Sequence, residues 1–174
     1  MAMPALLIEV GDTTRALQDL AREVRRRSGA RVVAITGSAG KTTTKEVIAA
    51  FLSARFDVFR NQGNLNNHIG VPLTLLKIKA DAEIAIIEMG ANHQHEIESY
   101  CVYAQPTHGL ITNCGKAHLE GFGGVEGVRK GKGELYNYIH AHGGTVFVNG
   151  DDEALLDMLK QRSINKYISY GQCP

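Results

Sequence analysis

Residues 31–54 constrain the fold of this chain more than any other part of it. Residues 31–36 form a run rich in β-branched residues, which is typical of a buried strand, and residues 45–54 have a helical pattern. Between them lies the loop Gly37-Ser38-Ala39-Gly40-Lys41-Thr42-Thr43. A strand, a glycine-rich loop and a helix in this order predict a phosphate-binding loop, and therefore a site for a nucleoside triphosphate with magnesium.

The residues of this loop match the chemistry of phosphate binding. Its glycines let backbone N–H groups turn toward phosphate oxygens, its lysine reaches the β and γ phosphates, and the next hydroxyl binds magnesium. Gly37, Gly40, Lys41 and Thr42 can fill these roles. Ile35 stands where the full GxxxxGK[ST] pattern has its first glycine, so the prediction rests on GxxGKT in its strand-and-helix context.

The rest of the chain predicts an α/β fold. Strand-like runs follow at residues 56–59, 83–88, 109–112, 145–148 and 166–169, and helical patterns lie at residues 12–28, 94–104, 124–141 and 151–161. Asp12 or Thr13 is the expected N-cap of the first helix, and Gly29 its stop. Alternating strands and helices imply right-handed crossovers and a mostly parallel sheet flanked by helices, as in P-loop NTPases. A length of 174 residues indicates one domain.

Ligands of such sheets bind beyond the carboxyl ends of the strands, which here are Thr36, Glu88 and Thr112-Asn113. Glu88 closes a buried strand, where P-loop enzymes place a carboxylate for the metal. Taken alone, it could equally be an exposed acid at a strand end. The polar loop of residues 112–123 is expected to be functional because of its position, and it contains His118.

Other polar residues have structural interpretations when read alone. The six remaining histidines are expected to be surface or structural residues, and Lys130 and Lys132 to be solvated helix lysines. Asn64, Asn66 and Asn67 could form a polar turn. Arg22, Arg25, Arg26 and Arg27 are expected to lie on a solvated helix face.

Composition excludes several classes of protein. A formal net charge of +1 provides no basic field for nucleic acid. Three cysteines without a CxxC spacing suggest neither a disulfide framework nor a zinc site and fit a reducing cytoplasm. No apolar run approaches the ~20 residues that span a bilayer, and the first residues lack the order of a signal peptide.

Five motifs in order give the chain a family resemblance. They are Thr36-Gly37-Ser38-Ala39-Gly40-Lys41-Thr42-Thr43-Thr44-Lys45-Glu46, Gly63-Asn64-Leu65-Asn66-Asn67 with Gly70, Pro72 and Thr74-Leu75-Leu76, Glu88-Met89-Gly90-Ala91-Asn92, Ala117-His118-Leu119-Glu120-Gly121-Phe122-Gly123, and Lys132-Gly133-Glu134. Together they resemble the central domain of the Mur ligases. The Ser-Ala of the loop and the EMGAN and AHLEGFG sequences are most similar to the members that add D-Ala-D-Ala to UDP-N-acetylmuramoyl-tripeptide.

The resemblance implies an incomplete central domain. Residues 1–30 would be a linker strand and helix from a preceding domain, and residues 31–174 the N-terminal part of the ATP-binding domain. Complete family members also have an N-terminal domain for the uridine nucleotide and a C-terminal domain for the amino substrate. We therefore expect a monomeric, cytoplasmic fragment that does not catalyse ligation alone.

The resemblance also implies a reaction and roles for residues. ATP phosphorylates the carboxylate of the muramoyl peptide, and the amine of D-Ala-D-Ala attacks the acyl phosphate. The residues expected to bind ATP are Gly37, Ser38, Ala39, Gly40, Lys41, Thr42 and Thr43. Thr42 and Glu88 would hold one Mg²⁺, and His118 a second.

Three further residues receive roles from the resemblance. Lys132 falls where most family members carry a lysine carbamylated by carbon dioxide, whose anionic oxygens suit a hard metal ion. Carbamylation requires a neutral amine, so the pKa of Lys132 has to be lowered by burial or nearby cations. Lys41, His118 and Lys132 would be catalytic, and Asn66 and Asn67 would lie near the muramoyl substrate.

Two other functions remain compatible with the sequence. One is a related ligase that joins another amino acid to another carboxylate. The other is a nucleotide-binding module without catalysis, although the combination of Lys41, Glu88, His118 and Lys132 favours an enzyme.

Overall fold

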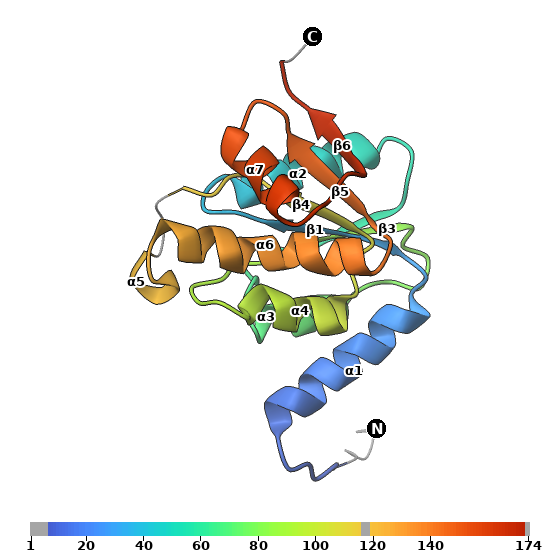
Figure 1. Cartoon of the computed structure of the whole chain (residues 1–174). Helices are drawn as coiled ribbons and strands as arrows, with labels where there is room; N and C mark the ends of the chain where they lie inside the picture. Colours follow the sequence, from blue (N-terminus) through green and yellow to red (C-terminus); the bar gives the residue numbers. More distant parts are fainter. Residues whose placement is uncertain (1–6, 116–118, 173–174) are drawn as a thin grey trace.

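The structure is a computed structural model, and it describes residues 7–115 and 119–172. The described residues form one six-stranded sheet in the order β2-β3-β1-β4-β5-β6, in which every neighbouring pair is parallel. The strands are β1 (Arg31–Thr36), β2 (Val58–Arg60), β3 (Ile84–Glu88), β4 (His108–Ile111), β5 (Thr145–Asn149) and β6 (Tyr167–Tyr170). The predicted mostly parallel α/β fold is therefore confirmed (Figure 1).

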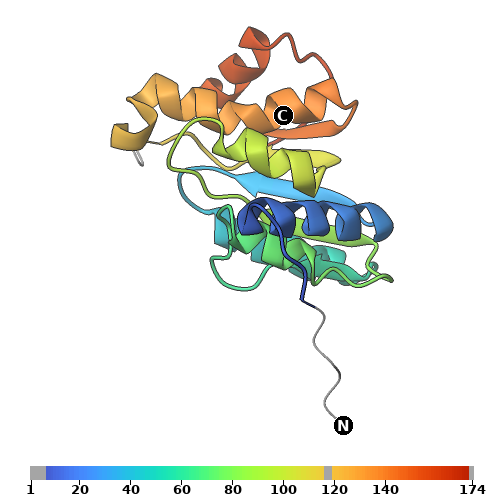
Figure 2. The ribbon, with the colours of Figure 1, turned by 90° about the horizontal axis from the view of Figure 1, so that it is seen from below.

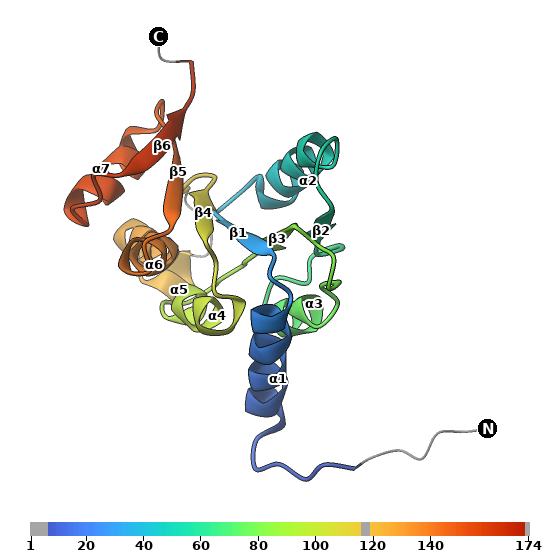
Figure 3. The ribbon, with the colours of Figure 1, turned by 90° about the vertical axis from the view of Figure 1, so that its right-hand side faces the viewer.

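Helices connect the strands and cover both sides of the sheet. They are α1 (Thr13–Arg27), α2 (Lys41–Leu52), α3 (Gly70–Leu75), α4 (Glu96–Ala104), α5 (Leu119–Phe122), α6 (Val125–Ala141) and α7 (Glu153–Gln161). Figure 3 shows α2 on one side of the sheet and α3, α4 and α6 on the other. None of the helices in the described ranges is long and apolar enough to cross a membrane.

Alternation of side chains along the strands produces two apolar clusters. In β1, Val32 and Ala34 belong to the larger cluster, whereas Ile35 belongs to the smaller one. In β3, Ile84 and Ile86 likewise belong to the smaller cluster, which includes Ala49 of α2. Because successive strand residues point to opposite faces, the odd or even position of a residue in its strand (its parity) determines which helices its side chain contacts.

Helix α1 packs into the same layer as the helices of the larger cluster. Figure 2 shows α6, α4, α1 and α3 across one face of the sheet, and α1 contacts both α3 and α4. Asp12 is its N-cap, with a side-chain oxygen 2.9 Å from the Arg15 nitrogen, as predicted. Residues 7–10 form no strand in this structure. The assignment of residues 1–30 to a preceding domain stays a prediction.

Arg25 departs from the predicted solvated face of α1. It is buried, and its guanidinium donates to the carbonyl oxygens of Ala104 and Gln105, at 3.0 and 3.2 Å. These carbonyls lie at the C-terminal end of α4, where a helix has unsatisfied acceptors and a negative dipole end. Arg25 therefore joins α1 to α4.

We predict that Arg25→Met lowers the free energy of unfolding by about 2–4 kcal/mol, because one buried and one partly buried carbonyl lose a charged donor. The control is Arg26→Met, which removes an exposed arginine paired with Glu23 and should change stability by less than about 1 kcal/mol. Urea denaturation of the chain measures both. Equal effects would show that α1 is not held to α4 by this contact.

Candidate active site

The glycine loop of residues 37–40 joins β1 to α2 at the carboxyl edge of the sheet. Helix α2 begins at Lys41, four residues earlier than predicted, because the end of the loop itself forms the first helical turn. Its N-cap is Gly40, in the left-handed conformation with φ of 78°, and no side chain caps the helix there. The first amides of α2 and its positive dipole end are thus available to an anion.

Residues that follow β4 hold the loop in shape. Thr112 Oγ1 and Asn113 Nδ2 donate to the Ala39 carbonyl oxygen at 2.6 and 3.0 Å. The Ala39 amide donates to Asn113 Oδ1 at 3.2 Å. A side chain at position 37 would collide with Thr112, which explains the need for Gly37. The strand end at residues 112–113 therefore lies against the loop.

Lys41 folds back over this loop. Its ammonium donates to the Gly37 carbonyl oxygen at 2.7 Å. Burial lowers the pKa of Lys41, and the nearby negative charge of Glu88 partly opposes that effect. Ser38 donates from its hydroxyl to the Gly115 carbonyl at 3.1 Å, and Thr43 is exposed on α2.

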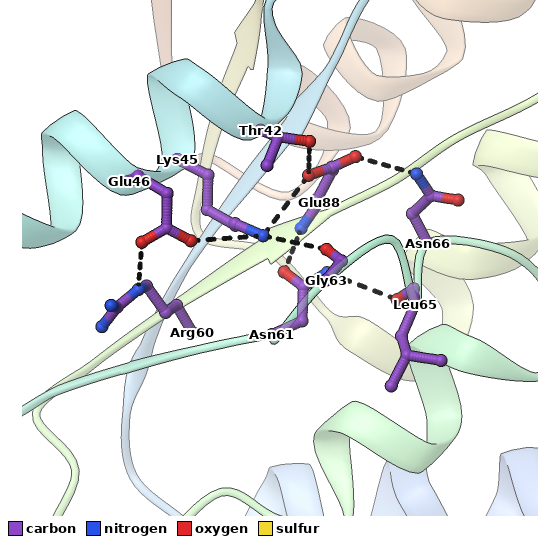
Figure 4. Close-up of polar contacts among 9 residues, drawn as sticks. All are labelled: Thr42, Lys45, Glu46, Arg60, Asn61, Gly63, Leu65, Asn66 and Glu88. Carbon is purple, nitrogen blue, oxygen red and sulfur yellow. Dashed lines mark hydrogen bonds and ion pairs between the residues drawn. The ribbon is translucent and has the colours of Figure 1, made fainter.

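Glu88 ends β3 with its side chain toward α2, because it has the same parity as Ile84 and Ile86. Figure 4 shows its carboxylate between two segments. Thr42 Oγ1 donates to Oε2 at 2.9 Å, and Asn66 Nδ2 donates to Oε1 at 2.8 Å. Glu88 is 1% exposed, so the interpretation as an exposed acid at a strand end is wrong.

Lys45 also contacts Glu88, and the sequence predicted no role for it. It is fully buried, and its ammonium lies 3.5 Å from Glu88 Oε2 and 3.6 Å from Glu46 Oε1. It also donates to the Gly63 carbonyl oxygen at 3.2 Å. One signal in the sequence is its spacing of one helical turn from Lys41, which places both lysines on the same side of α2.

The donors at Thr42 and Glu88 suit a magnesium ion. Mg²⁺ prefers oxygen ligands, and proteins commonly supply one or two of these while phosphates and water supply the others. In residues 7–115 and 119–172, no group of three or more His, Cys, Asp or Glu side chains could hold a metal ion. A hydroxyl and a carboxylate beside a phosphate-binding loop fit an ion that is bound together with a nucleotide.

Lys132, on α6, is buried rather than solvated, which corrects the structural interpretation of this residue. Its ammonium lies 3.4 Å from the Ala91 carbonyl oxygen and 5.3 Å from the centre of the Phe122 ring. Burial, and secondly the positive charge of Lys41, lower the pKa of Lys132 to about 8. This meets the condition for carbamylation. Lys130, by contrast, is exposed as expected.

Glu134, two residues after Lys132, has a structural role. Its carboxylate accepts hydrogen bonds from the backbone nitrogens of His95 and Glu98, at 2.6 and 3.0 Å. It thereby caps the N-terminus of α4, which begins after His95 in a left-handed conformation. In the Lys-Gly-Glu motif, Lys132 is therefore a candidate site residue and Glu134 a helix cap.

The asparagines proposed for substrate binding have different positions. Asn66 contacts Glu88 and packs closely on Gly90, where an added methyl group would lie 2.8 Å from Asn66 Oδ1. Asn67 accepts from the backbone nitrogens of Ile69 and Gly70, at 3.1 and 2.8 Å, and so starts α3. That buried helix was absent from the predicted elements. His118 lies outside the described residues.

A separate hollow of about 600 Å³ lies beside α2. Ile48 and Leu52 of α2 line it together with Leu110 and Phe147 of the sheet. Its lining is mainly apolar and does not include Lys41, Glu88 or Lys132. The polar cluster at the strand ends, rather than this hollow, has the donors that phosphate chemistry requires.

Comparisons with known proteins agree with the motifs. The family model for the Mur ligase middle domain matches residues 35–174. A UDP-N-acetylmuramoyl-tripeptide–D-alanyl-D-alanine ligase from Escherichia coli is 44% identical over 155 residues, which are 89% of this chain and 34% of the relative. The chain therefore spans about a third of the length of this curated relative.

Two solved structures resemble the fold closely. A crystal structure of MurF from Acinetobacter baumannii has a TM-score of 0.85 and 37% identity, over 94% of this chain and 36% of that one. MurF ligase from Thermotoga maritima, solved in complex with ADP, has a TM-score of 0.82 and 31% identity, over 94% and 37%.

We predict that Lys132→Met stabilises the chain near neutral pH in buffer free of carbon dioxide, by at most about 3 kcal/mol. The folded chain disfavours the proton on Lys132, since burial lowers its pKa from 10.5 to about 8. This cost is fully present below the folded pKa and disappears as the pH rises to the unfolded value. The gain should therefore vanish above about pH 10.

Urea denaturation at the two pH values measures this effect. Lys130→Met is the matched control, because it removes an exposed lysine from the same helix and should not change stability at either pH. A gain that is equal at both pH values would mean that packing, and not charge, is responsible.

Proposed function

This chain belongs to the Mur ligase family, and we propose that it is the ATP-binding part of a ligase that adds D-Ala-D-Ala to UDP-N-acetylmuramoyl-tripeptide in peptidoglycan precursor synthesis. The observation that carries the proposal is the contact of Thr42 with the buried Glu88, beside a phosphate-binding loop. The names of the relatives support the choice of substrates.

The first chemical step would join two anions. The terminal carboxylate of the peptide attacks the γ-phosphorus of ATP, the bond to the β–γ bridging oxygen breaks, and ADP leaves. Lys41 and the first amides of α2 offset the repulsion between carboxylate and phosphate. Thr42 and Glu88 would hold Mg²⁺, which when bound neutralises charge on the β and γ phosphates.

The second step would form the peptide bond. The amine of D-Ala-D-Ala attacks the acyl carbon, a tetrahedral intermediate forms and loses a proton, and inorganic phosphate leaves. A second Mg²⁺ near the acyl phosphate would be held by His118 and by Lys132 in its carbamylated form. We also propose that Asn66 and Asn67 lie near the muramoyl substrate.

We place this reaction in the cytoplasm and expect the protein to act as a monomer. The nucleotide substrates and the free thiols of Cys101 and Cys114 support this compartment.

We predict that a longer protein containing these residues and the other two thirds of its relatives' length couples ATP cleavage to ligation of D-Ala-D-Ala. Lys41→Met should lower kcat by about 10²-fold or more, because a charged donor to the transferred phosphate is lost. Lys79→Met, which changes an exposed lysine, is the control. We expect the 174-residue chain alone to bind ATP weakly and not to ligate.

Measurement of phosphate release and of dipeptide addition separates the alternatives. No turnover with these substrates would reject the proposal. Turnover with another amino acid would support a different Mur-type ligase, and nucleotide binding without turnover under any substrate would support a binding module.

We predict that Lys132 is carbamylated. In carbon-13 NMR with labelled bicarbonate, a carbamate signal should grow as the pH rises through the pKa of about 8, at constant dissolved carbon dioxide. The reason is that only the neutral amine reacts. The signal should be absent from Lys132→Met and present in Lys130→Met. An unchanged spectrum in Lys132→Met would contradict the assignment.

A further inference from the structure

The ammonium of Lys45 is fully buried and lies 3.5 Å from Oε2 of Glu88, the candidate metal ligand. We propose that Lys45 is a positioning residue, which fixes the Glu88 carboxylate in the orientation that binds the metal ion. The inference rests on the proposed function, because it assumes that Glu88 is a metal ligand. Figure 4 shows Lys45 and Thr42 reaching the same carboxylate from α2.

The hydrogen bonds of Glu88 leave space for one more partner. A carboxylate offers about four acceptor positions. Thr42 and Lys45 share Oε2, at 2.9 and 3.5 Å, and Asn66 occupies one position on Oε1, at 2.8 Å. The carboxylate is thus held from both ends, and among residues 7–115 and 119–172 one of its acceptor positions has no partner.

Burial of Lys45 needs a reason that packing does not provide. Lysines usually keep the ammonium in water, and an apolar side chain could fill the same space without the cost of removing a charge from water. Lys45 has 0% exposure, and Glu88 is almost as buried. A buried carboxylate without an opposite charge nearby is strongly unfavourable, and Lys45 provides that opposite charge beside Glu88.

Lys45 also connects three segments of the chain. Besides Glu88, it contacts Glu46 on α2 and the Gly63 carbonyl in the loop that carries Asn66. Asn61 begins the same loop and accepts from the Glu88 backbone nitrogen at 3.0 Å. The position of Asn66 on Glu88 therefore depends on a loop that Lys45 holds at a second point.

Lys41 and Lys45 have separate tasks in this arrangement. Lys41 donates to the Gly37 carbonyl on the loop, where a phosphate would lie, whereas Lys45 contacts Glu88. Loss of Lys45 should therefore weaken binding of the metal ion and leave the affinity for the nucleotide itself unchanged. Loss of a merely structural lysine would affect both or neither.

The test measures Mn²⁺ affinity of the chain in the presence of ADP by electron paramagnetic resonance. Lys45→Met should weaken Mn²⁺ binding about 10- to 100-fold, as for other residues that orient metal ligands. The affinity for ADP in EDTA should not change. Lys160→Met is the matched control, because it removes a lysine from an exposed carboxylate pair and should leave both affinities unchanged.

If Lys45→Met does not fold, Lys45→Gln replaces it, and the same loss of Mn²⁺ affinity is expected. The unmodified chain gives an independent measurement, since the ammonium signal of Lys45 in nitrogen-15 NMR should shift when Mg²⁺ is added to the ADP complex. Unchanged Mn²⁺ affinity in a folded variant, or an ammonium signal that does not respond, would overturn the role of Lys45. Failure of the unmodified chain to bind Mn²⁺ with ADP would instead reject the proposed function.

Discussion

The burial of the Glu88 carboxylate determines the arrangement of the residues around the phosphate-binding loop. Glu88 comes from β3, Thr42 and Lys45 from α2, and Asn66 from the loop that precedes α3. A buried charge requires compensation, and in this chain the compensating groups come from segments that are distant in sequence. The candidate site and the local fold are therefore coupled, because the same contacts that compensate the buried Glu88 carboxylate also connect the loop and the helix.

Lys41, Lys45 and Lys132 differ in the groups that surround their ammonium groups. Lys45 has an opposite charge beside it, and Lys41 has a backbone carbonyl. Lys132 lies 3.4 Å from a backbone carbonyl oxygen and 5.3 Å from the centre of an aromatic ring, and burial, with the positive charge of Lys41, lowers its pKa to about 8. A lysine with this lowered pKa is suited to react as a neutral amine.

Much of the fold follows from sequence patterns, and the exceptions have physical causes. The strands are short apolar runs beside turns, so their positions were predicted to within about two residues. Helix α3 was missed because it is short and almost wholly buried, which leaves no amphipathic period to detect. Helix α2 starts early because threonines with low helix propensity form its first turn, where the glycine loop sets the geometry. Glu88 was predicted from its strand end, whereas Lys45 and Arg25 were not, since only tertiary contacts bury these cations.

The larger apolar cluster and the candidate site lie on opposite faces of the sheet. The larger apolar cluster lies on the face covered by α3, α4 and α6, whereas the smaller one lies beneath α2. Buried charges such as Lys45 and Glu88 cost stability unless each is compensated, and sites of this kind are supported by packing elsewhere in a domain. Parity along β3 directs Glu88 to the α2 face and Met89 into the larger cluster. Consecutive residues at the end of this strand thus serve the two faces: Met89 packs in the larger cluster, and the Glu88 carboxylate lies toward α2, outside the main core.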